Sequence, residues 1–298
     1  MNMTAMQRIG LVGGGAMGRG IAQLFAGAGH DVAIFDAQSG AADAARDFVG
    51  SMFARAADKE KMTREDATSA LSRIIACQTI ADMAQCDIVI EAIVEQMAAK
   101  QQLFRELEAV VADGAILATN TSSLIISEIA AGCRRPERVA GLHFFNPVPL
   151  MRVAEVIAAV RTAPDVLATL RAVVEGAGHR AVSALDQPGF LVNHAGRGLY
   201  TEGLAILEEQ VAPHDVIDRV LREAAGFRMG PFELFDLTGL DVSGKVLESI
   251  FAQFQQDPRF RPSALLPPRI AAGLFGRKTG EGWYRYNDDA PAPASPAS

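Results

Sequence analysis

The sequence predicts an α/β protein with a doubly wound, mostly parallel sheet, followed by an all-helical domain. Up to residue 187, short apolar strands alternate with helical stripes of period 3.6, and a glycine-rich turn follows the first strand. Beyond Asp186-Gln-Pro-Gly189 the strand pattern disappears and only helical stripes remain. We therefore expect a sheet domain over residues 1–187 and a helical domain over 188–287. A tail over 288–298, dominated by alanine and proline, is expected to be disordered.

The composition is typical of a globular protein. Its 298 residues are 49% hydrophobic and 21% charged, which allows a sizeable core. A net charge of −7 excludes a general nucleic-acid-binding surface. Cys77, Cys86 and Cys133 form no CxxC pair, so we expect neither a metal site nor a disulfide framework. No signal segment precedes the first strand and no apolar run approaches the ~18 residues of a membrane span, so we expect a cytoplasmic protein.

The first βαβ unit carries a dinucleotide-binding fingerprint. The strand Arg8–Val12 runs into Gly13-Gly-Gly15-Ala16-Met17-Gly18, then a helix to about Ala26, then a strand over residues 29–36 that ends on an acid. Gly13 permits the tight turn, Gly15 lets the backbone approach a pyrophosphate, and Gly18 lets helix and strand pack closely. The pyrophosphate would sit at the N-terminus of this helix, which is expected to begin at about Met17, so Ala16 and Met17 are expected to bind the cofactor with the glycines. We therefore expect a Rossmann-type domain, the alternative being a glycine-rich turn that binds nothing.

Asp36 decides the predicted cofactor. It lies eighteen residues after Gly18, where it would accept hydrogen bonds from the adenosine ribose and repel a 2′-phosphate. No arginine follows at Ala37 or Gln38 to hold such a phosphate. These residues favour NAD over NADP.

Residues 41–73 predict a helical hairpin inserted after the second strand. Apolar residues at i, i+3 and i+4 mark its first helix, and Thr63 with Asp66 is typical of the N-terminus of its second helix. The tip carries four cations, Arg55, Lys59, Lys61 and Arg64. They form either a solvated surface or a local site for phosphates.

Alternation resumes after the hairpin. Asp87–Glu91 is a predicted strand, Glu95 lies in the following turn, and residues 97–111 form a helix. The next strand, residues 115–119, ends in Asn120-Thr-Ser122-Ser123, at the edge where doubly wound sheets bind ligands. Further along, Thr162 with Asp165 is expected to cap a helix that ends near Gly176, and residues 179–183 are the last predicted strand. The predicted helices of the second domain cover residues 191–209, 215–225 and 242–254.

Two further short strands, residues 139–143 and 152–157, flank a segment with Pro147 and Pro149. The prolines exclude a helix between the strands, which can therefore lie side by side with His143 and Glu155 at neighbouring ends. A carboxylate beside an imidazole fixes its tautomer and stabilises its charged form, as a general base requires. The alternative is that His143 and Glu155 only satisfy each other's hydrogen bonds in the core and have no catalytic role.

Several motifs together resemble the 3-hydroxyacyl-CoA dehydrogenase family, of the short bacterial 3-hydroxybutyryl-CoA dehydrogenase type. The resemblance runs from Arg8 to Tyr286 and includes the glycine-rich turn with Asp36. Its other motifs are Glu91-Ala-Ile-Val-Glu95, Asn120-Thr-Ser-Ser-Leu124, His143-Phe-Phe-Asn-Pro-Val-Pro-Leu-Met151, Gly189-Phe-Leu-Val-Asn193, Met229-Gly-Pro-Phe-Glu-Leu234 and Gly276-Arg-Lys-Thr-Gly280. The stretch from Tyr200 to Gln210 is also similar to the branch acting on 3-hydroxyadipyl-CoA.

The resemblance implies a role for particular residues. His143 is the expected catalytic base and Glu155 its acidic partner, while Ser122 and Asn193 surround the substrate C3 oxygen and the nicotinamide. The resemblance further implies that Asn146 shapes the substrate pocket and that Glu95 and Lys100 line the cofactor site. Asn120 is also expected to bind the cofactor, and Lys59 and Lys61 to bind the substrate.

The resemblance has departures. His194 stands where the family usually has arginine, and Gly196 and Gly198 stand where larger helix formers are common. These glycines suggest either a close helix contact or a wider acyl pocket, because each costs a helix about 1 kcal/mol relative to alanine.

The function implied is reversible, NAD-dependent oxidation of an L-3-hydroxyacyl-CoA to its 3-oxoacyl-CoA, the chemistry of fatty-acid β-oxidation, by a homodimer formed through the helical domain. Two alternatives remain. One is an NAD-dependent dehydrogenase of a free hydroxy acid such as a sugar acid, and the other is a non-catalytic nucleotide-binding protein of the same fold.

Overall fold

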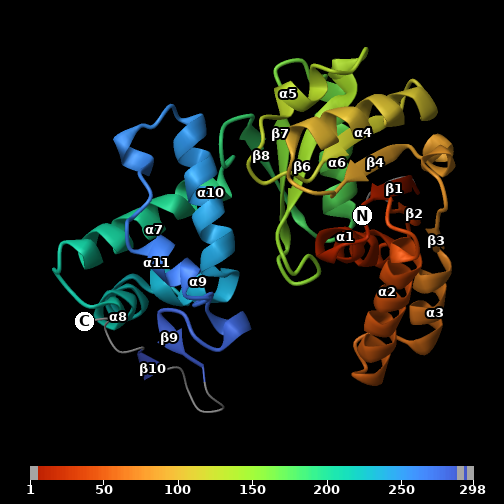
Figure 1. The fold of residues 1–298 in the computed structure, drawn as a ribbon. Coiled ribbons are helices and arrows are strands. Elements are labelled where there is room, and N and C mark those ends of the chain that lie inside the picture. The colour runs from red at the N-terminus through yellow and green to blue at the C-terminus, as the bar shows by residue number, and fades with distance from the viewer. Residues whose placement is uncertain (1–5, 287–291, 294–298) are drawn as a thin grey trace. The chain divides into compact units, whose positions relative to one another are not determined.

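The chain divides into two compact units after Phe190. A computed structural model describes residues 6–286 and 292–293, in the element order shown in Figure 1. The first unit holds a large sheet with its helices, and the second is mainly helical. The predicted fold class is therefore confirmed.

Eight strands form the sheet of the first unit, in the order β3-β2-β1-β4-β5-β6-β7-β8. Every neighbouring pair is parallel except β6 and β7. The strands are β1 (Arg8–Val12), β2 (Asp31–Phe35), β3 (Ile74–Ala76), β4 (Ile88–Glu91), β5 (Ile116–Thr119), β6 (Val139–Phe144), β7 (Val153–Ala158) and β8 (Arg180–Leu185).

Helices cover both faces of this sheet because successive strand residues point to opposite sides. Ile88 and Ile90 of β4 pack in one apolar cluster with Phe25 of α1 (Ala16–Gly27) and Leu170 of α6 (Pro164–Gly176). Val89, between them, belongs to a second cluster with residues of α4 (Met97–Val110) and α5 (Ile126–Ala130). Two short 3₁₀ helices, η1 (Ile80–Gln85) and η2 (Pro136–Arg138), complete this unit.

The inserted hairpin consists of α2 (Ala41–Asp58) and α3 (Arg64–Ser72), which project together from the sheet (Figure 1). Val49 and Phe53 form part of the predicted apolar stripe and are buried. Thr63 caps α3 by accepting a hydrogen bond from the Asp66 amide at 3.0 Å, as predicted.

The strands β6 and β7 pair antiparallel, with His143 directly opposite Glu155. The loop between them packs against α1, where Val148 occupies the space beside Gly20 that a side chain would need. A Cβ at Gly20 would lie 3.0 Å from the Val148 side chain. This contact ties the loop after His143 to the helix that follows the glycine-rich turn.

One predicted cap is wrong. Thr162 does not cap α6, whose N-cap residue is Ala163 and has no side-chain hydrogen bond. Instead, the Thr162 hydroxyl donates to the Val139 carbonyl at 2.6 Å and accepts from the Ala159 amide. The hydroxyl thus closes the turn after β7, and Pro164 at the first helical position removes one donor that a cap would satisfy.

The second unit packs its helices around Phe232, Phe235 and Trp283. Its helices are α7 (Val192–Glu208), α8 (His214–Ala225), α9 (Pro231–Thr238), α10 (Leu240–Gln253) and α11 (Leu266–Ala271), with the 3₁₀ helices η3 (Pro258–Phe260) and η4 (Arg277–Thr279). Asp218 of α8 is fully buried and accepts the amide hydrogens of Phe232 and Glu233 at the start of α9.

Near the end of the described chain, β9 (Tyr284–Arg285) pairs antiparallel with β10 (Ala292–Pro293). The two tail residues in β10 therefore differ from the predicted disorder, and the rest of the 288–298 tail lies outside the described residues. Among the helices that the structure describes, none has the length and apolar character needed to span a bilayer.

Candidate active site

A buried histidine–carboxylate pair lies where β6 and β7 meet. His143 Nδ1 is 2.7 Å from Glu155 Oε2, and the two residues are 5% and 0% exposed. The antiparallel register brings them together because each stands directly opposite the other. A buried carboxylate at Nδ1 favours the tautomer with its proton on Nδ1, which leaves Nε2 as the basic nitrogen.

The ring of His143 is held by aromatic neighbours. The Phe145 ring centroid is 4.5 Å from that of His143, and the Phe190 centroid is 5.8 Å away. No hydrogen bond to Nε2 is formed by the described part of the chain. The pair therefore combines a fixed ring, a buried counter-charge and a nitrogen that can accept a proton.

Polar residues gather at the carboxyl end of the neighbouring strand β5. Asn120 follows this strand, and its side-chain oxygen accepts the Phe144 amide hydrogen at 2.9 Å. Glu95 Oε1 accepts from the Ser122 amide at 3.0 Å and from the Thr121 hydroxyl at 2.5 Å. The turn that carries Ser122 is thereby anchored to the turn after β4, and Asn120 is anchored beside His143.

A buried ion pair supports this turn. Lys100 of α4 is 1% exposed, and its Nζ lies 2.5 Å from Glu91 Oε1 and 3.3 Å from Glu95 Oε2. Glu91 also accepts from the Thr119 hydroxyl at 2.7 Å. Burial favours the protonated form of Glu95, but Lys100 and the hydrogen bonds from Thr121 and Ser122 outweigh it and hold the pKa of Glu95 below its ordinary value.

The glycine-rich turn has the geometry of an anion cradle. Gly13 has a φ of +110°, which L side chains rarely adopt, and a Cβ at Gly18 would lie 1.8 Å from the Gly13 carbonyl oxygen. The position of a Cβ at Gly15, by contrast, has nothing within 4 Å. Gly15 is the N-cap of α1, and no acid in the first turn of this helix compensates the positive end of its dipole.

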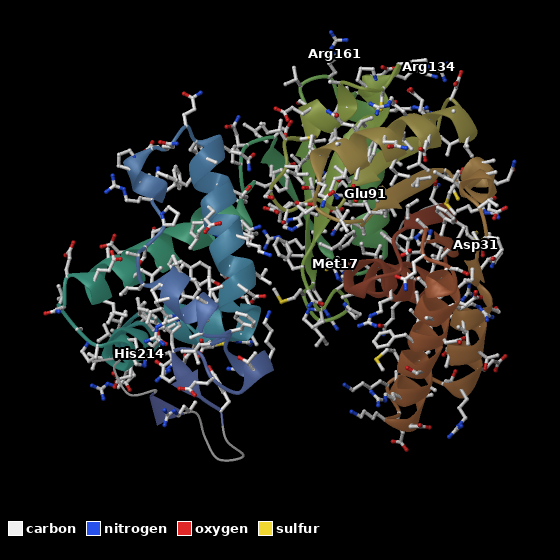
Figure 2. All side chains as sticks on the ribbon, viewed as in Figure 1. Met17, Asp31, Glu91, Arg134, Arg161 and His214 are labelled. Carbon is white, nitrogen blue, oxygen red and sulfur yellow. The ribbon has the colours of Figure 1, made fainter. Side chains whose placement is uncertain are left out.

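The cradle and the polar turn share one edge of the sheet, where the parallel strands end. Glu91 at the end of β4 pairs with Val12 at the end of β1, directly before the cradle. Met17, in the first turn of α1, and Glu91, the last residue of β4, are labelled in Figure 2. A dinucleotide bound at the cradle would therefore extend toward Asn120 and Ser122, because ligands of doubly wound sheets lie along this edge.

Asp36 lines a small hollow beside the cradle. Its Oδ2 accepts the Gly14 amide hydrogen at 2.7 Å, and its Oδ1 accepts that of Gln38 at 2.8 Å. The hollow, about 210 Å³, is also lined by Cys77 and Gln78 after β3. Its position next to the second strand suits the adenosine half of a dinucleotide.

The other predicted site residues lie in different settings. Asn146 is exposed in the loop between β6 and β7, and Lys59 and Lys61 are exposed at the hairpin tip. Asn193 lies in the second unit, in the first turn of α7, where its side-chain oxygen is 3.4 Å from Arg197 Nη2. The sequence pattern assigned no role in the site to Glu91 or Arg197, because the burial of these charged residues is visible only in the structure.

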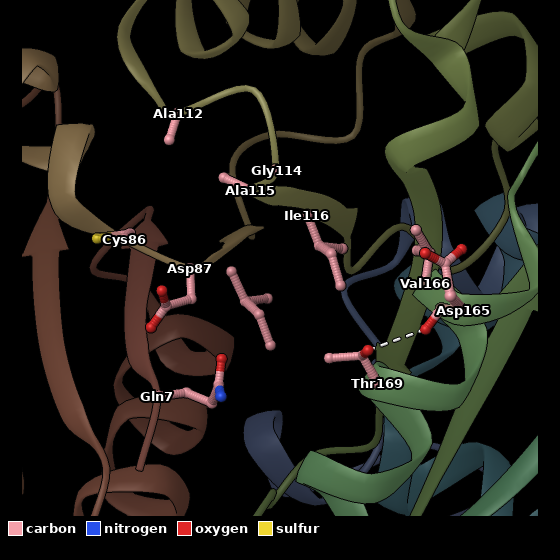
Figure 3. Close-up of a pocket in the computed structure, with 11 residues that line it drawn as sticks. Gln7, Cys86, Asp87, Ala112, Gly114, Ala115, Ile116, Asp165, Val166 and Thr169 are labelled. Atoms are coloured by element: carbon pink, nitrogen blue, oxygen red, sulfur yellow. Dashed lines mark hydrogen bonds between the residues drawn. The ribbon is translucent and has the colours of Figure 1, made fainter. Parts of the chain in front are cut away.

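A larger hollow lies at the opposite, amino-terminal edge of the sheet (Figure 3). It has a volume of about 410 Å³ and is lined by Gln7, Asp87 and Asp165 among mainly small or apolar residues. Thr169, also in its wall, donates its hydroxyl hydrogen to the Asp165 carbonyl at 2.9 Å. Its one thiol, Cys86, is buried, which raises the pKa of the thiol to about 11 and makes it a poor nucleophile.

Comparison with known proteins agrees with this geometry. Residues 8–187 match the model of the 3-hydroxyacyl-CoA dehydrogenase NAD binding domain, and residues 189–286 match that of the C-terminal domain of the same enzymes. The chain belongs to the 3-hydroxyacyl-CoA dehydrogenase family. The predictions of this family, of an NAD-dependent dehydrogenase and of NAD as its cofactor are confirmed.

Individual relatives are similar over nearly the whole chain. A 3-hydroxyadipyl-CoA dehydrogenase of Escherichia coli is 40% identical over 97% of this chain, which spans only 61% of that relative's length. A probable 3-hydroxybutyryl-CoA dehydrogenase of Bacillus subtilis is 39% identical, with 95% of this chain and 98% of the relative covered. The crystal structure of (S)-3-hydroxybutyryl-CoA dehydrogenase from Ralstonia eutropha has a TM-score of 0.91 and 36% identity, covering 95% of this chain and all of the other.

Proposed function

We propose that this member of the family oxidises an L-3-hydroxyacyl-CoA to the 3-oxoacyl-CoA, reversibly, with His143 as general base and Glu155 as its partner. The observation that carries the proposal is the buried 2.7 Å pair of His143 and Glu155 in the same sheet domain as the glycine-rich cradle. In the oxidation, His143 Nε2 takes the proton of the 3-hydroxyl group. Glu155 stabilises the imidazolium that this transfer creates.

The residues around the cradle suit NAD. Gly15 leaves room for the pyrophosphate at the N-terminus of α1, and Asp36 can accept hydrogen bonds from the ribose. When bound, NAD supplies the hydride acceptor. Asn120 and Ser122 would line the site toward the nicotinamide, held in place by Phe144 and Glu95 respectively.

We assign Ser122 and Asn193 to the C3 oxygen, which both can bind through side-chain donors. In the reverse direction they would polarise the C3 carbonyl before His143 returns its proton. Glu95 and Lys100 support this arrangement by anchoring the Ser122 turn, in addition to lining the cofactor site. Asn146, in the loop after His143, would contact the acyl group.

The helical hairpin supports a CoA ester as substrate. Lys59 and Lys61 are exposed cations on a protein of net charge −7, and we assign them to the CoA phosphates. This feature distinguishes an acyl-CoA enzyme from a dehydrogenase of a free hydroxy acid, which has no phosphate to hold. We also propose a homodimer formed through the helical domain and a cytoplasmic location.

A direct assay tests the proposal. NADH oxidation is measured with acetoacetyl-CoA and with free acetoacetate at equal concentrations. We expect turnover of the CoA ester and at least a 100-fold lower kcat/KM for the free acid, because the free acid forgoes the binding energy of the CoA moiety. Equal turnover of the two, or turnover of neither, would contradict the proposed substrate class.

A further inference from the structure

The loop between β6 and β7 carries two residues of the candidate active site. Phe145 packs its ring against that of His143, with the ring centroids 4.5 Å apart, and Asn146 is the residue assigned to the acyl group. Asn146 and the following Pro147 are exposed, so packing in the core does not fix them. The contacts that hold this loop therefore determine where both side chains lie.

Val148 anchors the loop on two sides. Its side chain is 1% exposed and lies against Gly20 of α1, where an added Cβ would be 3.0 Å away. Its carbonyl oxygen lies 2.8 Å from Nε2 of His179, which directly precedes β8 (Figure 1). One anchor is thus the helix after the glycine-rich turn, and the other is a single side chain at the start of the last strand of the sheet.

His179 contacts both ends of the segment 144–148. Besides the bond to the Val148 carbonyl, its ring meets that of Phe144 edge-on, with 6.2 Å between the centroids and 70° between the planes. Phe144 is the last residue of β6, so this contact lies where the loop begins. His179 therefore braces the segment between its ring and its Nε2.

The polar side of His179 serves this loop. A carbonyl oxygen can only accept, so Nε2 carries a proton and donates it to Val148. The other ring nitrogen, Nδ1, is buried and has no hydrogen-bond partner in the described structure. A buried polar atom without a partner is unfavourable, and an apolar ring would avoid that cost. The bond to the loop is what a histidine adds at this position.

We propose that His179 is a positioning residue for the reaction. By holding the segment 144–148, it keeps Phe145 against the catalytic base and Asn146 in place for the acyl group. This inference rests on the proposed function and adds a residue that acts through the loop. Loss of the bond should lower catalytic efficiency and leave cofactor binding at the cradle unchanged.

Three replacements of His179 separate positioning from packing. His179→Phe keeps a ring against Phe144 and removes the donor. Its kcat/KM for acetoacetyl-CoA should fall on the order of 10- to 100-fold, because a displacement of about 1 Å can cost this much, while the dissociation constant of NADH should stay within about twofold of the wild type. His179→Gln keeps an N–H donor at a similar reach and should recover most of the loss. His179→Asn has a shorter side chain and should not.

His30 provides a matched control. It is 4% exposed, against 6% for His179, and its ring meets Phe25 edge-on as that of His179 meets Phe144. Phe25 packs against Phe144 with 5.9 Å between the centroids, so lost packing could reach the loop from either histidine. The hydrogen bond of His30, however, is to the Gln7 amide. His30→Phe should therefore keep kcat/KM near the wild-type value even where it lowers the melting temperature.

Hydrogen exchange tests the brace without catalysis. The amides of Leu150 and Met151 both donate to the Pro147 carbonyl at 3.0 Å, so they report the order of the loop. We expect them to exchange faster in His179→Phe than in the wild type. In His179→Gln and His30→Phe they should exchange at close to the wild-type rate.

Several results would overturn the proposal. These are unchanged kcat/KM in folded His179→Phe, equal losses in His179→Phe and His30→Phe, or a parallel weakening of NADH binding, which would indicate general disruption. Should His179→Phe not fold, equal kcat/KM in His179→Gln and His179→Asn overturns the proposal, and a lower value in His179→Asn supports it. If the wild type reduces no 3-oxoacyl-CoA, the proposed function fails instead, and hydrogen exchange still decides whether His179 holds the loop.

Discussion

His143 Nδ1 lies 2.7 Å from Glu155 Oε2 across β6 and β7, the one antiparallel pair in the eight-stranded sheet that the structure describes. Antiparallel pairing sets the two residues directly opposite each other, so the backbone register brings their side chains within reach. A slip of one residue would turn one side chain to the other face of the sheet. The sheet therefore preorganises the pair before any substrate binds.

Cofactor choice depends on Asp36. Asp36→Ala removes both the hydrogen bonds to the ribose and the repulsion of a 2′-phosphate, so the preference for NADH over NADPH should narrow by roughly 10- to 100-fold in kcat/KM. Asp36→Asn is the matched control, because it keeps a hydrogen-bond acceptor and loses only the charge. Its preference for NADH should lie between those of the wild type and Asp36→Ala. Equal wild-type efficiency with both cofactors would refute the assignment.

The buried pair of Lys100 and Glu91 should stabilise the fold only as a pair. Lys100→Met leaves the fully buried Glu91 carboxylate without its counter-charge, so the free energy of unfolding should fall by about 3–5 kcal/mol. Adding Glu91→Gln removes the uncompensated charge and should recover much of this loss. Urea denaturation of the wild type, both single variants and the double variant measures the coupling, and simple additivity would contradict the expected interaction.

The proposed binding of CoA phosphates at the hairpin tip is tested by measuring how KM depends on ionic strength. Lys59→Gln with Lys61→Gln should raise KM for acetoacetyl-CoA, leave KM for NADH unchanged and weaken the dependence of the former on ionic strength. Arg134→Gln with Arg161→Gln is the control. Both arginines are exposed, and replacing them removes the same number of positive charges from another surface (Figure 2). If both double variants behave alike, the tip is only a solvated surface.

Asp218 should make stability depend on pH. Burial, despite hydrogen bonds from two amides and Tyr284, raises the pKa of Asp218 to about 6, and Glu233 contributes in the same direction. The folded state therefore holds a proton that the unfolded state releases at lower pH, so the stabilisation is complete below about pH 4 and is lost as pH rises through about 6. Asp218→Asn should flatten the fall in unfolding free energy between pH 4 and 6, measured by denaturation. If the fall in unfolding free energy between pH 4 and 6 is unchanged in Asp218→Asn, another group causes it.

Local patterns predicted much of the sheet domain. The glycine-rich turn, the hairpin cap at Thr63 and the facing positions of His143 and Glu155 all follow from short-range rules of spacing and turn chemistry. The short strand β3 was not predicted, because three residues directly after a helix carry too little pattern. Helix α9 was also not predicted. Its first turn is stabilised by Asp218 of α8, which accepts the amide hydrogens of Phe232 and Glu233.

The buried charged residues around the site could not be predicted from local sequence patterns. Glu91 ends a predicted strand, but its burial depends on Lys100 from the next helix, and only the three-dimensional structure shows their 2.5 Å pairing. Arg197 gave no signal in the sequence, since an arginine within a helix is ordinarily exposed. Both cases concern buried charges, whose acceptability depends on partners distant in the chain.

The most direct test of the catalytic pair is kcat for acetoacetyl-CoA reduction in His143→Asn, Glu155→Gln and the double variant, each shown to be folded and to bind NADH. We predict a loss on the order of 10²- to 10⁴-fold for His143→Asn and a smaller loss for Glu155→Gln. The double variant should be little worse than His143→Asn, because residues that act as one unit are not additive. Near-normal kcat in folded His143→Asn, or additive losses in the double variant, would contradict the account.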